Sequence, residues 1–208
     1  MLRLVVALPP EARPLVRHYG LKPPAEPEPF PIYQGEGIWL VVSGLGKLAA
    51  AAATSYLYLR SGGQRQAAWL NLGVGGHREH PLGTGLLAHK VMDEATGWRW
   101  YPPQLPELAI PSASVLTVER PETEYAGPWL YEMEASGFFV AASRFAAPPL
   151  VHCYKVVSDN LHQRTEKVDA ALVERLIDER LGELDLLVRQ LAALARDPAS
   201  AGRNESRR

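Results

Sequence analysis

Short, mostly apolar runs recur along the chain, and each one ends in a turn rich in glycine, proline or acidic residues. The main ones are Leu2–Leu8, Ala67–Leu72 and Val151–Val157. A continuous apolar run of this length is typical of a strand buried on both faces of a sheet. Two helical segments, Leu48–Leu59 and Val168–Leu194, follow such runs. Strands that alternate with helices predict one α/β domain whose sheet is largely parallel.

Less regular sequence patterns predict the remaining strands and helices of this domain. A hairpin is predicted at residues 30–42, around the turn Gly35-Glu36-Gly37, and a helix at Tyr131–Phe145. Two further strands are predicted at Leu86–Val91 and Ser114–Glu119. Between them, Trp98–Pro103 is an aromatic and proline-rich loop, which could wall a pocket, form a subunit contact or plug the core.

Acidic residues stand at three predicted element boundaries. Asp159 follows the last strand in the sequence V-V-S-D-N, Glu11 follows the first strand, and Glu132 and Glu134 flank a methionine at the head of a predicted helix. In open α/β sheets, ligands bind outside the carboxyl ends of the strands. We therefore expect these acids to meet in one pocket. Carboxylates in a first helical turn are also favoured by the helix dipole, so plain helix capping stays open for Glu11, Glu132 and Glu134.

Two glycine-rich segments follow predicted strands. The first is S-G-L-G-K at Ser43–Lys47, and the second is G-V-G-G at Gly73–Gly76. Both are predicted to be tight turns, in which backbone N–H groups can face an anion or a hydroxyl. The first has neither the spacing of a phosphate-binding P-loop nor that of a dinucleotide-binding G-x-G-x-x-G motif. The glycines by themselves therefore leave the ligand open.

Composition limits the classes of partner. The chain has 208 residues, a net charge of −1 and 47% apolar residues, which suits one globular domain. We expect this domain at residues 1–195 and a disordered polar tail at residues 196–208. No basic excess points to nucleic acid or to an anionic membrane, and no apolar segment is long enough to span a bilayer.

Cysteine and histidine usage adds little chemistry. The single cysteine, Cys153, lies in an apolar run, where it is expected to be a small buried side chain, and it fits a reducing compartment. No secretory signal is visible, because prolines interrupt the N-terminal apolar run, so a cytoplasmic protein is expected. His77 and His80 lie three residues apart without a third ligand in view. A solvated polar loop is therefore favoured over a metal site, and no metal or cofactor is expected.

Five landmarks, in this order, resemble the nucleoside phosphorylase superfamily. They are P-P-E at Pro9–Glu11, S-G-L-G-K at Ser43–Lys47, N-L-G-V-G-G at Asn71–Gly76, E-M-E-A at Glu132–Ala135 and V-V-S-D-N at Val156–Asn160. The chain is similar in particular to methylthioadenosine/S-adenosylhomocysteine nucleosidases, over about Leu2 to Leu194. The resemblance implies a three-layer α/β/α fold with a central mixed, barrel-like twisted sheet, and usually a homodimer. It also implies cleavage of the N-glycosidic bond between a purine-type base and ribose.

The resemblance assigns catalytic roles by position. Asp159 looks like the acid that protonates the base, or hydrogen-bonds to its N7, so that the base can leave. Ser158 would orient Asp159. Glu11 looks like the residue that positions or deprotonates the attacking water. General acid–base help of this kind typically contributes about 10²–10⁴-fold in rate.

Other landmarks would bind the nucleoside. The resemblance implies that the carboxylate of Glu134, with Met133 beside it, accepts hydrogen bonds from the ribose hydroxyls. Gly75 and Gly76 would run along the nucleoside. Ser43 would lie close to the site as a secondary candidate.

The chain also departs from the family pattern. Val74 stands where a small hydroxyl residue is common, and Lys155 stands where nucleosidases commonly carry arginine. The segment between Asp93 and Ser114 is short and rich in tryptophan and proline, so the substrate wall differs. The start P-P-E-A-R is similar to the hopanoid-associated phosphorylases, in which Arg13 could meet an anion.

Three functions remain open on this basis. A nucleosidase that uses water is favoured by Glu11 and by the absence of a clear arginine set for phosphate. A phosphorylase would need Arg13, or an arginine of a partner subunit, to hold phosphate. The altered glycine segment and the tryptophan-rich loop leave a third possibility, a non-catalytic protein that binds nucleosides.

Overall fold

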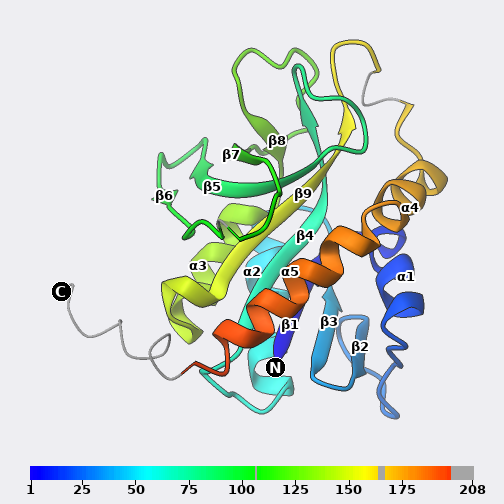
Figure 1. Ribbon diagram of the computed structural model, residues 1–208, viewed down its shortest axis with the longest axis vertical. Helices are drawn as coiled ribbons and strands as arrows, with labels where there is room; N and C mark the ends of the chain where they lie inside the picture. The colour runs from blue at the N-terminus through cyan, green and yellow to red at the C-terminus, as the bar shows by residue number, and fades with distance from the viewer. Residues whose placement is uncertain (106, 164–166, 198–208) are drawn as a thin grey trace.

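A computed structural model describes residues 1–105, 107–163 and 167–197 of the chain. The predicted tail at residues 196–208 lies outside the described residues, apart from its first two, and so do three residues of the loop that follows Asn160. The strands are β1 (Leu2–Val6), β2 (Ile32–Gly35), β3 (Ile38–Val42), β4 (Ala68–His77), β5 (Gly85–Asp93), β6 (Arg99–Trp100), β7 (Ser112–Thr117), β8 (Leu130–Glu132) and β9 (Val151–Asp159). The helices are α1 (Pro9–His18), α2 (Lys47–Arg60), α3 (Ala135–Phe145), the 3₁₀ turn η1 (Pro148–Leu150), α4 (Ala170–Asp178) and α5 (Leu181–Leu194) (Figure 1).

The central sheet closes on itself. Strands β4, β8, β7, β5 and β9 pair in a ring, since β9 joins both β4 and β5. Strands β1, β3 and β2 extend the sheet outward from β4, and β6 is added to β5. Parallel and antiparallel pairings both occur, and β4 and β9 run parallel along most of their length. The predicted mixed, barrel-like sheet is therefore confirmed.

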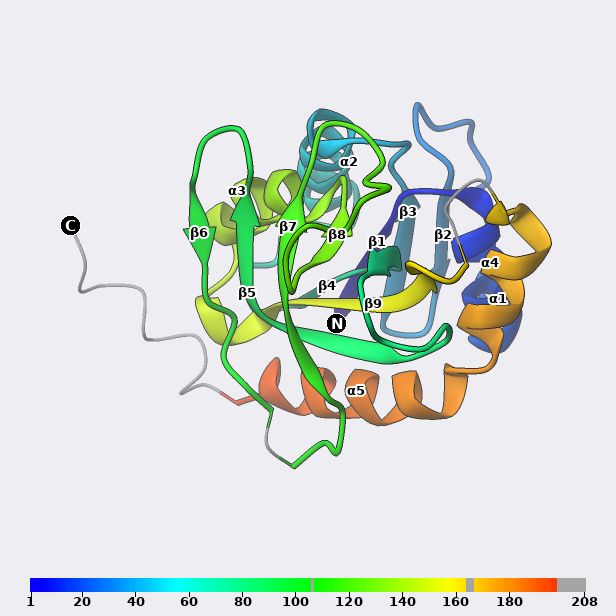
Figure 2. The same cartoon turned by 90° about the horizontal axis from the view of Figure 1, so that it is seen from above.

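Helices cover the sheet on two sides. Figure 2 shows α5 along one face and α2 with α3 on the opposite face, while α1 and α4 lie side by side at the end near β2. The apolar runs of β1, β4 and β9 are buried in the core between these layers, because both faces of each strand are covered. The predicted three-layer α/β/α arrangement is confirmed. In the part of the chain that the structure describes, no helix combines the length and the apolar character that crossing a membrane requires.

Three predicted elements differ from the structure. Gly73–Gly76 is not a turn, because these glycines continue β4 and pair with β9. The helix predicted at Tyr131–Phe145 begins only at Ala135, and its first residues belong to β8. The long helix predicted at Val168–Leu194 is interrupted at residues 179–180, between α4 and α5. Asp169 starts α4 by accepting a hydrogen bond from the backbone N–H of Leu172 at 2.8 Å, as an N-cap residue does.

Candidate active site

A pocket of about 170 Å³ opens at the carboxyl ends of β1, β4 and β9. Segments far apart in the sequence form its wall: the start of α1, the end of β4, the loop after β7, the start of α3 and the end of β9. Its lining residues are Ala7, Leu8, Glu11, Leu45, Val74, Gly75, Gly76, Val118, Pro121, Glu122, Tyr131, Glu132, Met133, Glu134, Ser158, Asp159 and Val168. The structure thus brings together Glu11, Glu134 and Asp159, the three acids that the sequence predicted to meet.

Glu11 is fixed at the junction between β1 and α1. One carboxylate oxygen accepts hydrogen bonds from the backbone N–H groups of Ala7 and Leu8, at 2.8 and 2.9 Å. The other oxygen accepts one from Val74 of β4, at 3.0 Å. Capping of α1 and a place in the pocket were alternatives from the sequence, and Glu11 does both.

Gly73 and Lys155 define the surroundings of Glu11. A methyl group at position 73 would lie 2.6 Å from Oε1 of Glu11, so only glycine lets β4 pass this close to the carboxylate. Burial raises the pKa of Glu11, and the nearby ammonium of Lys155 and three backbone N–H groups only partly oppose that rise. A buried carboxylate with a raised pKa is a better proton acceptor than a solvated one.

Glu134 points into the pocket from the residue before α3. Its Oε1 accepts a hydrogen bond from the backbone N–H of Gly46 at 2.8 Å, which gives the S-G-L-G-K segment a physical role. Burial raises the pKa of Glu134 to about 7; Glu132 and Glu11 add to the rise, while Lys155 opposes it. Near neutral pH the protonated and ionised forms of Glu134 are therefore both populated.

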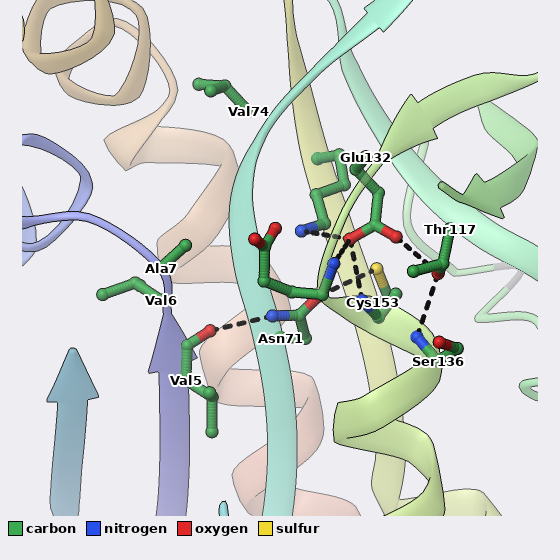
Figure 3. A network of polar contacts seen from close by, with 12 residues as sticks. Val5, Val6, Ala7, Asn71, Val74, Thr117, Glu132, Ser136 and Cys153 are labelled. Atoms are coloured by element: carbon green, nitrogen blue, oxygen red, sulfur yellow. Dashed lines mark hydrogen bonds and ion pairs between the residues drawn. The ribbon is translucent and has the colours of Figure 1, made fainter. Parts of the chain in front are cut away.

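Glu132 anchors the floor beneath these acids. Its carboxylate accepts hydrogen bonds from the N–H groups of Glu134 and Ala135, at 3.0 and 2.8 Å, and one from the hydroxyl of Thr117 at 2.6 Å. Lys155, which is 2% exposed, places its Nζ 2.9 Å from the same carboxylate. Figure 3 shows Glu132 beside Thr117, which also links to Ser136. Glu132 thus performs the helix capping that the sequence left open, and it lines the pocket together with Glu134.

Lys155 is the buried cation of this network. Burial alone would lower its pKa, but the carboxylates of Glu132, Glu134 and Glu11 outweigh burial, and the pKa is raised. Lys155 therefore stays charged under all ordinary conditions. Lys155 is thus paired with the Glu132 carboxylate, which lines the pocket.

Asp159 is aimed into the pocket by an irregularity in β9. Gly75 pairs with Val157 and Gly76 pairs with Asp159, so Ser158 is an extra residue in the ladder. Such a bulge redirects the side chains beside it. The hydroxyl of Ser158 donates to Oδ1 of Asp159, and the hydroxyl of Tyr125 donates to Oδ2. Sequence reasoning missed Tyr125, because it stands in the loop between β7 and β8 without any local pattern.

The remaining predicted binding residues separate into two groups. Met133, Gly75 and Gly76 line the pocket, together with Val74. Ser43 is not among the lining residues. Its hydroxyl donates to the backbone carbonyl oxygens of Val6 and Gly44, so it holds the turn between β3 and α2 rather than facing a ligand.

The other residues singled out by the sequence serve the scaffold. Arg13 is exposed on α1 and forms an ion pair with Glu174 of α4, away from the pocket. His77 accepts hydrogen bonds through Nδ1 from the backbone N–H groups of Glu79 and His80, so it shapes the turn after β4.

Over the described residues, no group of three or more histidine, cysteine or acidic side chains could hold a metal ion. Cys153 is buried, as expected, and burial raises the pKa of its thiol to about 12.

The charge of the pocket is one-sided. Five of its lining residues are acidic, and none of the described lining residues is lysine, arginine or histidine. Fixed negative groups in a buried site stabilise positive charge that develops on a ligand. The arrangement therefore suits a reaction that passes through a cation and can move protons at Glu11, Glu134 or Asp159.

No protein-family model and no curated protein matches this sequence. Solved structures do match the fold. The 5'-methylthioadenosine/S-adenosylhomocysteine nucleosidase of Helicobacter pylori is 13% identical, with a TM-score of 0.73 over 91% of this chain and 97% of that one. Futalosine hydrolase of the same organism gives the same four values. The 5'-methylthioadenosine nucleosidase of Arabidopsis thaliana is 16% identical, with a TM-score of 0.71 over 94% of this chain and 95% of that one.

Proposed function

We propose that this chain, which has the nucleoside phosphorylase/hydrolase fold, is a nucleosidase that hydrolyses the N-glycosidic bond of a purine-type nucleoside. The bond between ribose C1′ and base N9 breaks, and its electron pair stays with the base. Asp159 supplies a proton to the base, for example at N7. A water oxygen bonds to C1′ and gives up its proton to Glu11, so the products are a free base and a free ribose.

One observation carries this proposal: Glu11, Glu134 and Asp159, which come from three distant parts of the sequence, line one buried pocket. N-glycosidic cleavage passes through a ribosyl cation, and such a state is stabilised by fixed carboxylates. Glu11 is held by three backbone N–H groups and has a raised pKa, which suits a base for water. Glu134 and Met133 line the same pocket, and in this proposal Glu134 binds the ribose hydroxyls.

Water is favoured over phosphate as the nucleophile. A phosphate dianion needs cationic or densely placed N–H partners, and arginine is the usual choice. Arg13, the phosphate ligand considered from the sequence, is exposed and paired with Glu174. The acidic lining would repel a dianion. The direct test of the activity is the release of free purine from adenosine, inosine and 5'-methylthioadenosine; no release from any purine nucleoside would contradict the proposal.

Replacing Glu134 by glutamine is expected to weaken nucleoside affinity and to stabilise the protein at alkaline pH. The neutral amide is a poorer acceptor for the ribose hydroxyls than a carboxylate. The pKa of Glu134 is raised from 4.5 to about 7, so its stabilising effect is complete below about pH 4.5 and is lost as the pH rises through 7. The variant lacks this loss and should gain about 1–3 kcal/mol at pH 8 and little at pH 5.

Nucleoside binding by calorimetry, and thermal unfolding at both pH values, check the two effects. Glu36→Gln is the matched control, because Glu36 is exposed in the turn between β2 and β3. Unchanged nucleoside affinity in Glu134→Gln would remove the ribose-binding role. Equal stability changes at pH 5 and pH 8 would contradict the raised pKa.

We further propose that the protein forms a homodimer through its α2–α3 side. Exposed apolar side chains gather there: Leu45 before α2, Leu48 on α2, Trp98 before β6 and Val140 on α3. Leu48, Trp98 and Val140 also line a shallow hollow of about 170 Å³. Exposed apolar patches of this kind mark interaction sites. Leu45 also lines the pocket, so a second copy seated on this patch would border the active site.

Changing Leu48 to glutamate is expected to convert the dimer to a monomer. This side chain is 83% exposed, so the charge should not disturb the fold of the single chain. Leu186→Glu is the matched control, since Leu186 is 53% exposed on α5, on the opposite side of the sheet. Sedimentation velocity measures the outcome. A monomeric wild type, or a dimer that survives Leu48→Glu, would contradict the proposed interface.

A further inference from the structure

Tyr125 is buried although its segment has no regular structure. It lies in the loop between β7 and β8, yet its side chain is only 1% exposed. It belongs to a small apolar cluster, separate from the main core, with Leu116, Val118 and Tyr131. Two members of this cluster, Val118 and Tyr131, line the pocket. Tyr125 therefore occupies space directly beside the pocket.

The ring and the hydroxyl of Tyr125 meet two residues of the proposed active site. The hydroxyl donates to Oδ2 of Asp159. The ring lies so close to Gly76 that a methyl group at position 76 would be 2.5 Å from Cε1 of Tyr125 and 2.6 Å from Oδ2 of Asp159. Gly76 thus leaves room for a flat ring that reaches the Asp159 carboxylate.

The backbone of Tyr125 is held in an unusual conformation. Its φ is +48°, and no other non-glycine residue among those described has a positive φ. Side chains with a Cβ rarely adopt this region, and they persist there only where surrounding contacts hold them. Arg78 supplies one such contact, since its Nη1 donates to the carbonyl oxygen of Tyr125 at 3.2 Å. Release of Tyr125 from Asp159 would allow this strain to relax.

We propose that Tyr125 fills the base subsite in the unliganded protein and is displaced by the purine base of the substrate. This inference rests on the proposed function, in which Asp159 is the acid at the base. A purine that has been protonated at N7 is a flat aromatic ring that donates an N–H hydrogen bond to the Asp159 carboxylate. Tyr125 presents the same features, a flat aromatic ring and one donor aimed at Oδ2.

Displacement of Tyr125 has a measurable consequence. In the open form Tyr125 has left the base subsite. The apparent affinity of a ligand that binds only this form is its intrinsic affinity multiplied by the fraction of molecules that are open. The hydrogen bond from Tyr125 to Asp159 favours the closed form, in which Tyr125 occupies the base subsite, so its removal should raise the open fraction. Tyr125→Phe keeps the ring and its packing but removes the donor, and we expect it to bind adenine about tenfold more tightly than the wild type.

The experiment compares adenine binding to the wild type, Tyr125→Phe and Tyr154→Phe by calorimetry. Tyr154 is a matched control: it is also buried and donates to a carboxylate, but its partner Glu183 is not a pocket residue, whereas Asp159, the partner of Tyr125, is one. Each variant loses one tyrosine hydrogen bond to a carboxylate, which is buried for Tyr125 and partly buried for Tyr154, so thermal unfolding of both variants is measured beside adenine binding. Only Tyr125→Phe should gain adenine affinity.

Each outcome decides the inference. Equal or weaker adenine binding by Tyr125→Phe, or no binding to it at all, overturns the inference. If the wild type hydrolyses nucleosides in that case, the proposed function stands without it. Tighter adenine binding by Tyr125→Phe supports the inference. If, in addition, neither protein releases base from any nucleoside, the purine-binding subsite stands and only the proposed hydrolase activity is contradicted.

Discussion

Replacing Asp159 by asparagine is expected to lower the turnover of a purine nucleoside by about 10²–10⁴-fold, the usual contribution of a general acid. An amide has the same shape as the carboxylic acid but cannot deliver a proton to the leaving base. Its carbonyl oxygen can still accept a hydrogen bond from the hydroxyl of Ser158 or Tyr125, so the fold should persist. The measurement is kcat for release of free base, with thermal unfolding to verify that the variant is folded.

Asp178 supplies the matched control for this substitution. It is half-exposed on α4, where it forms an ion pair with Arg17 at 3.1 Å, and it is remote from the pocket lining. Asp178→Asn should keep wild-type turnover, because a surface ion pair contributes little. Wild-type rates in Asp159→Asn would remove Asp159 from the mechanism.

Replacing Lys155 by methionine is expected to destabilise the protein by about 3–5 kcal/mol, the typical cost of removing one partner of a buried ion pair. The carboxylate of Glu132 would lose its cation, 2.9 Å away, and Glu11 and Glu134 would lose the charge that now lowers their pKa values. For a domain of this size the melting temperature should fall on the order of 10 °C. Thermal unfolding measures the loss.

The pH dependence and a double variant test the cause of this loss. Without Lys155, the pKa values of Glu11 and Glu134 rise further, so the variant should be least stable at alkaline pH and recover as the pH falls. Adding Glu132→Gln to Lys155→Met removes the unpaired charge and should restore much of the stability. A loss that is independent of pH and persists in the double variant would mean that lost packing, rather than charge, is responsible.

Local patterns predicted the elements that position the acids. The apolar run of β9 and its S-D-N ending placed Asp159 at a strand end, and the P-P-E sequence placed Glu11 at the start of α1. Such features are encoded within a few consecutive residues. The chain also shares the fold of solved nucleosidases, although identity to the three structures named above is only 13–16%.

The features that prediction missed depend on contacts between distant segments. Gly73 and Gly76 resemble a turn in the sequence, yet they extend β4 and pair with β9. They are glycines because Glu11, Tyr125 and Asp159 lie too close to that strand for any side chain. Tyr125 carries no local signal, since its hydrogen bond joins residues 34 positions apart. Ser43 was predicted close to the site as a secondary candidate, and its hydroxyl donates to backbone carbonyl groups, a contact that the sequence does not reveal.

The identity of the sugar product tests the central claim most directly. The wild-type protein would be incubated with a purine nucleoside in buffer with and without inorganic phosphate, and free ribose and ribose 1-phosphate would be quantified beside the released base. We predict one free ribose for each base released, at a rate that phosphate does not change, because Glu11 activates water and the described pocket lining offers no cation for phosphate. Formation of ribose 1-phosphate that requires added phosphate would contradict hydrolysis at this site.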